Sequence, residues 1–400
     1  MIKSIKLTNF LSFGNEQDEI ELRPLNIIIG TNGSGKSNFL EAFHLLQNLP
    51  TNVGLPIREG GGISDWLYKK GPNNRAFCAS LDVVISNTTI KKRFDELRYS
   101  ISLSAVGQGY EITEEQLVSK EPCLGESSPY IYYQLRNGRA TVNIQNVDSV
   151  SGTQQRTLQR EDIDITQSIL SQKRDAIHYP ELTNLAHEFS KIRMYRDWQF
   201  GRYTPPRLPQ KADMSNQCLE LDCSNLGLVL NRIEMNPSAK KRLLEELKFF
   251  YSDVENYGVN ISNNSVQIYF QERGLNSYVP ATRLSDGTLR YLCLLAILCN
   301  PDPPPLVCIE EPELGLHPDV LPRLVKLMQE VSERCQLVVT THSEAIVDSF
   351  TDDPEAIMVA GKNENGTLLT RLEKEELRPW LEKYRLGNLW TRGDIGGTRW

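Results

Sequence analysis

The segment Gly30-Thr-Asn-Gly-Ser-Gly-Lys-Ser37 combines residue types and a spacing that can enclose phosphate groups. It fits the pattern GxxxxGK[ST] in full and lies between a predicted buried strand and a predicted helix. Glycines allow backbone N–H groups to turn inward around a β-phosphate, and the helix that follows presents its positive N-terminal end. The sequence therefore predicts a nucleotide site formed by consecutive residues: Gly30, Thr31, Asn32, Gly33, Ser34, Gly35, Lys36, Ser37 and Asn38.

Charged and hydroxyl side chains in and beyond this loop predict phosphoryl transfer to water. Lys36 is expected to reach the β- and γ-phosphates, and Ser37 to ligate Mg²⁺. The apolar run Leu306-Val-Cys-Ile ends in two carboxylates, Glu310 and Glu311. We expect Glu310 to support Mg²⁺, usually through a water, and Glu311 to act as the general base on the attacking water.

A second apolar run, Val338-Val-Thr-Thr, ends in His342. An imidazole at that strand end could contact the γ-phosphate and the attacking water. We therefore predict Lys36, Glu311 and His342 as the catalytic set.

The segment Arg283-Leu-Ser-Asp-Gly-Thr-Leu-Arg290 opens a long apolar helix. Ser285 is a favourable N-cap, and Gly287 permits close approach of the backbone. Together they form an anion site at a helix N-terminus. In isolation an ordinary capped helix would be the better reading, but the position shortly before the strand that ends at Glu310 favours a functional role.

The elements that must position these residues lie at the two ends of the chain. An apolar strand over 25–29 precedes the glycine-rich loop, and a helix follows it. Near the other end, strands over 306–310 and 336–341 alternate with helices over 285–299 and 321–332. This alternation predicts an α/β fold with a central, mostly parallel sheet. The expected division is a split core (1–50 and 280–365), a β-rich part (51–150), a mainly helical arm or lid (151–279) and a C-terminal extension (366–400).

The composition narrows the class of protein. The chain has 400 residues, 40% apolar and 24% charged, with a formal net charge of −7, so it is not a general nucleic-acid coat. The longest apolar run, 291–299, is far shorter than the roughly 20 residues of a membrane span. The N-terminus lacks the apolar segment of a signal peptide. The cysteines are scattered, and several lie within apolar runs, which favours a reducing cytosol.

The glycine-rich loop, LSDGT, IEEPE and TTHS, in that order, resemble the ABC-type ATPase heads of the RecF, SMC and OLD proteins. The resemblance covers residues 1–46 and 280–360, and it implies a P-loop NTPase head with an antiparallel β subdomain and an inserted helical arm. Within the group the chain is similar to short AAA-type, RecF-like bacterial ATPases. These often occur in antiviral defence systems beside a TOPRIM-like nuclease.

The resemblance implies that two chains sandwich ATP and Mg²⁺. The signature residues Ser285, Asp286, Gly287 and Thr288 would then act in trans on the γ-phosphate of the partner chain. A homodimer or higher homo-oligomer in the cytoplasm would signal to DNA or to the nuclease, in defence or DNA repair and maintenance. The sequence departs from the group where Glu310 replaces the commoner Asp, which puts the turnover rate in question.

Two other functions share these motifs: the ATPase subunit of a membrane transporter, and a static ATP-clamped scaffold with little turnover. The insertion of more than 200 residues between loop and signature argues against the transporter. Two basic clusters leave further alternatives open. Arginines 193, 196, 202 and 207 interleave with aromatic residues, as in a nucleic-acid surface, a partner surface or ordinary packing. Lys240-Lys241-Arg242 precedes Glu245 and Glu246 on a predicted amphipathic helix, which favours a salt-bridged face.

Overall fold

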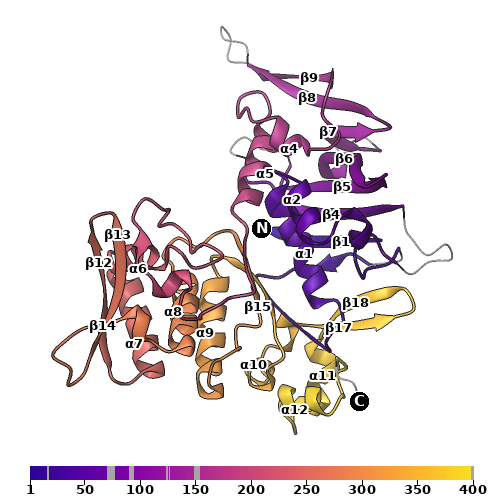
Figure 1. The fold of residues 1–400 in the computed structure, drawn as a ribbon. Helices are drawn as coiled ribbons and strands as arrows, with labels where there is room; N and C mark the ends of the chain where they lie inside the picture. The colour runs from indigo at the N-terminus through magenta and orange to yellow at the C-terminus, as the bar shows by residue number, and fades with distance from the viewer. Residues whose placement is uncertain are drawn as a thin grey trace. The chain divides into compact units, whose positions relative to one another are not determined.

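The computed structural model describes residues 1–15, 18–69, 77–89, 94–122, 125, 127–147 and 154–397 (Figure 1). The chain packs into two compact units. Unit 1 comprises residues 1–23, 30–192 and 358–371, and unit 2 comprises 24–29, 193–357 and 372–400. The domain boundaries expected from the sequence differ from the boundaries of these two units. Units defined by packing need not coincide with domains defined by sequence character, so the expected boundaries stay a prediction.

Unit 1 is built on an antiparallel sheet. Its strands lie in the order β2 (Ile20–Glu21), β1 (Ile2–Thr8), β4 (Cys78–Ser86), β5 (Glu96–Val106), β6 (Gly109–Pro122), β7 (Pro129–Arg136), β8 (Arg139–Val147) and β9 (Gln154–Glu161). Strand β5 alternates buried and half-buried residues along most of its length, as expected of a sheet with one covered face. Asn137 and Gly138 both have positive φ between β7 and β8, as expected of an Asn-Gly hairpin turn.

The covered face of this sheet contains a fully buried carboxylate. Glu115 of β6 accepts hydrogen bonds from the hydroxyls of Tyr99 (2.6 Å), Tyr133 (3.3 Å) and Ser168, and from the backbone N–H of Ile169 (3.0 Å). Burial is the largest effect on Glu115 and raises its pKa above the ordinary value. The network ties the sheet to α4 (Ile169–Gln172), which packs on α5 (Pro180–Ser190).

The remaining elements of unit 1 are short helices and a hairpin. Helix α1 (Lys36–Asn48) begins at the end of that loop and packs against α2 (Gly54–Glu59), which is followed by α3 (Ile63–Trp66). Strands β17 (Ile357–Asn363) and β18 (Gly366–Arg371) form an antiparallel hairpin.

Unit 2 contains the predicted parallel sheet. Strands β10 (Arg193–Tyr195), β15 (Leu306–Glu310), β16 (Gln336–Thr340) and β3 (Leu25–Gly30) lie side by side and run parallel. All residues of β3 and β16 are buried, which explains why their sequences are nearly continuous apolar runs. Asn26 is a polar exception, and its side chain donates to the carbonyl oxygen of Leu337 (3.1 Å).

Helices of unit 2 begin and end close to the predicted positions. Helix α8 (Asp286–Leu298) is almost wholly buried, and α9 (Leu321–Ser332) has the predicted bounds. Beyond β16 lie α10 (Glu344–Asp348), α11 (Lys374–Leu381) and α12 (Leu386–Thr391), of which α12 packs on α10.

The stretch 193–280 adds an antiparallel sheet to unit 2. Its strands are β11 (Gln210–Lys211), β13 (Ser265–Glu272) and β12 (Val254–Ser262), and β14 (Val279–Pro280) pairs with β13 (Figure 1). Helices α6 (Leu226–Glu234) and α7 (Pro237–Phe250) pack against it. We expected residues 151–279 to be mainly helical, but this stretch also contains strands β9, β12 and β13. Alternating residues of β13, buried at Val266, Ile268 and Phe270, form its covered face.

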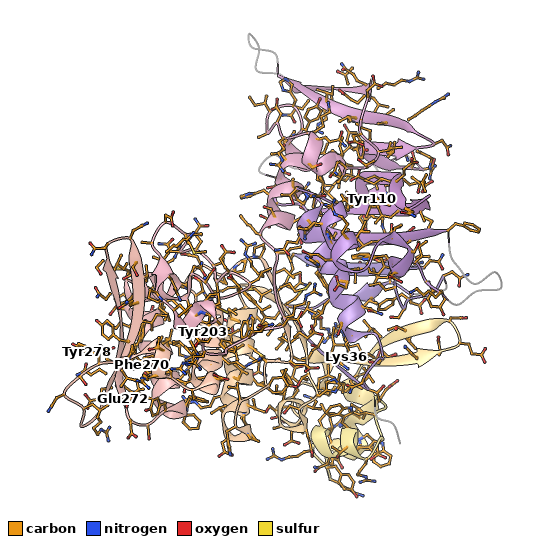
Figure 2. The ribbon with its side chains drawn as sticks, viewed as in Figure 1. Lys36, Tyr110, Tyr203, Phe270, Glu272 and Tyr278 are labelled. Carbon is orange, nitrogen blue, oxygen red and sulfur yellow. The ribbon has the colours of Figure 1, made fainter. Side chains whose placement is uncertain are left out.

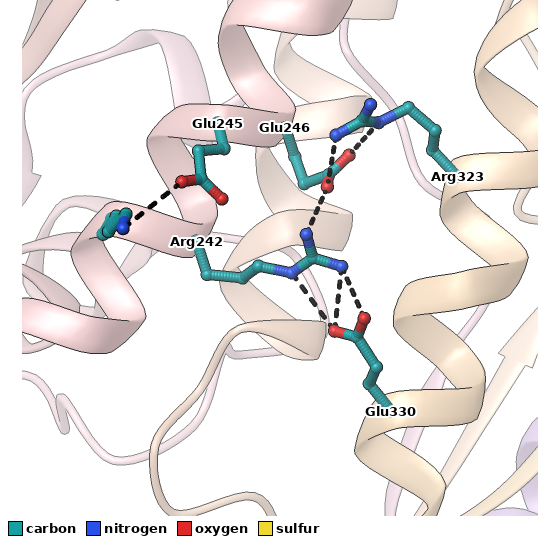
Figure 3. Close-up of polar contacts among 6 residues, drawn as sticks. Arg242, Glu245, Glu246, Arg323 and Glu330 are labelled. Atoms are coloured by element: carbon teal, nitrogen blue, oxygen red, sulfur yellow. Dashed lines mark hydrogen bonds and ion pairs between the residues drawn. The ribbon is translucent and has the colours of Figure 1, made fainter.

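The predicted salt-bridged face of α7 is confirmed, and one of its carboxylates is buried. Glu246 is 1% exposed and receives Arg323 of α9 at 2.7 and 2.8 Å and Arg242 at 2.8 Å (Figure 3). Arg242 also binds Glu330 of α9, at 2.7 Å. Glu245, the next residue along α7, is half exposed and lies 3.9 Å from the ammonium of Lys241. Charge pairing thus holds α7 to α9.

The expected α/β architecture, with a parallel sheet and an antiparallel β part, is confirmed. Within the described ranges, no helix is both long and apolar enough to cross a membrane.

Candidate active site

The glycine-rich loop of unit 1 leads directly into helix α1. Gly35 has a φ of 109° and precedes the first helical residue of α1. A Cβ at this position would lie 2.2 Å from Thr367 Oγ1, so a side chain cannot be accommodated. The Thr367 hydroxyl is itself fixed, because it donates to Ser34 O (2.9 Å) and lies 2.7 Å from the Ser12 hydroxyl, which can donate to it in turn. Strand β18 therefore supports the loop from the side.

The side chain of Lys36, which is labelled in Figure 2, binds its own loop. Its side chain is buried, and its ammonium donates to the carbonyl oxygens of Gly30 (2.8 Å) and Thr31 (3.0 Å). Helix α1, all of whose residues the structure describes, has no acidic residue in its first turn and no side-chain cap at its N-terminus. Ser34 Oγ is buried without a hydrogen-bond partner among the described residues. An ammonium beside uncapped helical N–H groups is a suitable cradle for phosphate oxygens.

The two predicted carboxylates of unit 2 lie where β15 ends. Glu310 is the last residue of the strand and is paired in register with Thr340 of β16. Glu311 has a φ of 44°, a left-handed conformation that is uncommon for a residue other than glycine. Its N–H donates to Thr340 O (3.0 Å), which holds the turn against the neighbouring strand. Such local strain is often found at functional sites.

The structure brings His342 to Glu311. The imidazole Nε2 lies 3.5 Å from Glu311 Oε1, and both side chains are about one-third exposed. His342 follows the end of β16, and the preceding residue, Thr341, donates its N–H to Ile28 O of β3 (3.1 Å). The predicted general base and the predicted histidine are therefore neighbours at the carboxyl ends of adjacent parallel strands.

Glu313 is a residue of this site that the sequence reasoning missed. One carboxylate oxygen, Oε1, accepts from Thr341 Oγ1 and from the N–H of His342, both at 2.7 Å. The other, Oε2, is buried and has no hydrogen-bond partner among the described residues. Burial raises the pKa of Glu313, and the nearby charge of Glu311 raises it further. The acidic run after β15 was the available signal, but its contact with β16 is not visible in the sequence.

The predicted signature residues form the start of α8. Ser285 is the N-cap: its Oγ accepts from the N–H of Thr288 (3.1 Å) and lies 2.8 Å from the Thr288 hydroxyl. Ser285 and Asp286 are exposed, whereas Thr288 is buried. A Cβ on Gly287 would lie 2.9 Å from Gly315 O, so this glycine permits close packing on the segment that follows the carboxylates.

Arg207, one of the arginines of the arginine and aromatic cluster, is buried and binds the backbone just before the signature. It is 8% exposed and donates to Phe200 O (2.8 Å) and Leu284 O (2.5 Å), and it also pairs with Asp286. Tyr195 is buried too, with its hydroxyl on Leu219 O (2.8 Å). Tyr203, by contrast, is 81% exposed (Figure 2). Ordinary packing therefore accounts for Arg207 and Tyr195.

Arg290 of α8 is a further cation beside the carboxylates. Its guanidinium lies 5.7 Å from the Trp198 ring centroid and 5.4 Å from that of Phe200. Burial lowers its pKa, although the negative charges of Glu313 and Glu311 oppose the shift.

The predicted ligands of Mg²⁺ are the side-chain oxygens of Ser37 and Glu310. In the portion of the chain that the structure describes, no group of three or more His, Cys, Asp or Glu residues could hold a metal ion. Mg²⁺ is usually bound by one or two protein oxygens together with substrate phosphates and waters. The hydroxyl of Ser37 and the carboxylate of Glu310 suit that role in chemistry, and the assignment stays a prediction.

The chain resembles known proteins in sequence and in fold. An ATP/GTP phosphatase of Helicobacter pylori (strain ATCC 700392 / 26695) is 21% identical over 383 residues, covering 87% of each chain. The SmcHead bound to the C-winged helix domain of ScpA has a TM-score of 0.60 at 14% identity and covers 94% of this chain and 99% of that chain. An Smc head domain with an extended coiled coil, from Pyrococcus furiosus, has a TM-score of 0.55 at 14% identity and covers 96% and 98%. At these identities the structural likeness establishes the fold.

Residues 25–348 match the family described as "AAA domain, putative AbiEii toxin, Type IV TA system". This match spans the glycine-rich loop, the signature, the carboxylates and His342. The chain belongs to this AAA family, and it is an ATPase with the fold of an SMC head.

Proposed function

We propose that two copies of this chain close around ATP and reopen after hydrolysis. The cycle would act in the cytosol as a conformational signal to DNA or to a nuclease partner, in bacterial anti-phage defence or DNA maintenance. The observation that carries the proposal is the exposed start of α8. Ser285 caps a helix N-terminus at the surface of unit 2, where a phosphate group of another chain could approach it.

The proposed division of labour follows from the local chemistry. Lys36, now bonded to two carbonyl oxygens of its own loop, would exchange them for β- and γ-phosphate oxygens. Ser37 and Glu310 would hold Mg²⁺, which would offset phosphate charge when bound. Glu311 would accept a proton from the attacking water, and His342, 3.5 Å away, would orient that carboxylate and contact the γ-phosphate.

The proposal of a signalling output rests on analogy. Two Smc head structures with this fold contain a domain of the protein ScpA bound to the head. A head of this fold can therefore bind a partner domain, and we extend this to a nuclease or DNA partner for this chain.

Mixing two inactive variants tests the action in trans. Lys36→Ala removes the ammonium from the loop. Ser285→Asp keeps an N-cap acceptor for the N–H of Thr288 but places a negative charge where the partner's phosphate would lie. Each variant alone should lose ATPase activity. The mixed dimer would contain one intact site, because that site takes its loop from the Ser285→Asp chain and its signature from the Lys36→Ala chain.

An equimolar mixture should therefore regain about a quarter of wild-type activity, since half of the pairs are mixed and each has one of two sites intact. Ser285→Thr, which keeps the capping hydroxyl, is the matched control and should remain active. A mixture as inactive as its components would refute the sandwich.

Glu311→Gln separates an active ATPase from a static scaffold. Without a base on the water, the variant should bind ATP but hydrolyse it about 100-fold more slowly, and it should elute as a dimer with ATP. Equal turnover in wild type and variant would eliminate Glu311 as the general base, and a monomer in the presence of ATP would count against closure.

A further inference from the structure

The geometry points to Glu313 as a positioning residue for ATP hydrolysis: its carboxylate holds the end of β16 so that His342 meets Glu311. This inference rests on the roles proposed for Glu311 and His342. The sequence from Glu311 to Glu313 leaves β15 in a left-handed turn, and the Glu313 side chain then reaches the neighbouring strand.

Both ends of the contact are fixed by short hydrogen bonds. Oε1 of Glu313 accepts from the His342 N–H and from the Thr341 hydroxyl, each at 2.7 Å. The Thr341 hydroxyl in turn accepts from the N–H of Ser343 (3.0 Å), which is the N-cap of α10. The backbone on both sides of the His342 side chain is therefore oriented through one carboxylate oxygen.

The bonds join the same two segments that the catalytic pair joins. Glu311 donates its N–H to Thr340 O (3.0 Å), and its carboxylate lies 3.5 Å from the imidazole of His342. Without Glu313, the turn after β15 would keep its bond to β16 at Thr340, but the Thr341 hydroxyl and the His342 N–H would lose their acceptor. The imidazole could then rotate away from Glu311 while both strands stayed in register.

Two substitutions of Glu313 can separate the effect of its negative charge from the effect of its hydrogen bonds. Oε2 has no hydrogen-bond partner among the described residues, so no donor opposes an amide group at that place. Gln therefore keeps an oxygen acceptor for both bonds and puts its NH₂ where Oε2 lies, whereas Ala removes the acceptor.

The experiment measures kcat and KM for ATP in Glu313→Ala, Glu313→Gln, His342→Ala and the double variant Glu313→Ala/His342→Ala. We expect Glu313→Ala to lower kcat about 10- to 100-fold with KM nearly unchanged, because the two hydrogen bonds that orient His342 are lost. Glu313→Gln should keep most of the turnover. The double variant should be no slower than His342→Ala alone, because Glu313 acts through that residue.

Wild-type turnover in Glu313→Ala, or effects that multiply in the double variant, would overturn the inference while leaving the proposed catalytic pair intact. Wild-type turnover in His342→Ala would instead remove the pair itself, and the inference with it. If Glu313→Ala does not fold, Thr341→Val and Thr341→Ser replace it. Valine removes one of the two donors and should lower kcat about fivefold, whereas serine keeps the hydroxyl and should not.

Discussion

Removal of the buried carboxylate of Glu246 should destabilise unit 2 strongly, and the residue beside it provides the control. Glu246 is 1% exposed and binds two guanidinium groups, those of Arg323 and Arg242 (Figure 3). Breaking a buried ion pair costs about 3–5 kcal/mol, because a charge is left without compensation. The lower end applies here. Arg323 is 38% exposed and can be hydrated, and Arg242 keeps Glu330.

We therefore expect Glu246→Ala to lower the free energy of unfolding by about 3 kcal/mol. For a unit of this size that corresponds to a fall in Tm of about 6–12 °C. Glu245→Ala removes the same side chain one position earlier on α7. Glu245 is 51% exposed and has only a 3.9 Å contact with Lys241, so its loss should cost about 0.5 kcal/mol or less.

Urea denaturation followed by tryptophan fluorescence, together with thermal melts, measures both variants under the same conditions. Coincident unfolding curves for the two would show that Glu246 contributes no more than a surface pair. That result would refute the assignment of α7–α9 docking to this network.

Two further predictions concern unit 1. Gly35→Ala should weaken ATP binding about tenfold more than Gly33→Ala, measured by titration calorimetry. Both glycines have left-handed φ, but only at Gly35 would the new Cβ overlap Thr367, at 2.2 Å, whereas nothing lies within 4 Å at Gly33; equal losses would show that the overlap is harmless. The second concerns Glu115, whose pKa is raised by burial, so its contribution to stability is full below the unfolded pKa of about 4.3 and is lost as pH rises through the folded pKa. The stability of wild type relative to Glu115→Gln should therefore fall as pH rises from 4 to 8 in urea titrations, and a rising difference would mean that the folded pKa is lowered instead.

Local patterns in the sequence were sufficient for the elements that carry the site. The buried strand β3, the helix α9 and the Ser285 cap of α8 all depend on residues close together in the chain, so periodicity and capping chemistry predict them. The order of motifs then identified the fold, which the likeness to Smc heads confirms.

What the sequence could not supply are contacts between distant segments. Glu313 reads as a solvated acidic residue until β16 is placed beside β15, and Arg207 reads as a surface cation until its carbonyl partners at 200 and 284 are known. The β12–β13 hairpin turns at Asn263 and Asn264, both with positive φ. The Asn-Asn pair is a turn signal in the sequence, but the stronger periodic pattern of the amphipathic helix before it favoured a helical prediction for this region.

The packing of Gly287 on the carbonyl of Gly315 has a consequence for the choice of alleles in genetic work. A side chain at position 287 would displace the segment that follows Glu311 in the same chain. The substitution would therefore impair the site of the chain that carries it, in addition to the site of the partner chain. Such an allele should complement a Lys36 mutant poorly even if signature and loop belong to different subunits. Ser285 alleles, which leave that stretch untouched, are the ones whose dominance or recessivity reports on partnership.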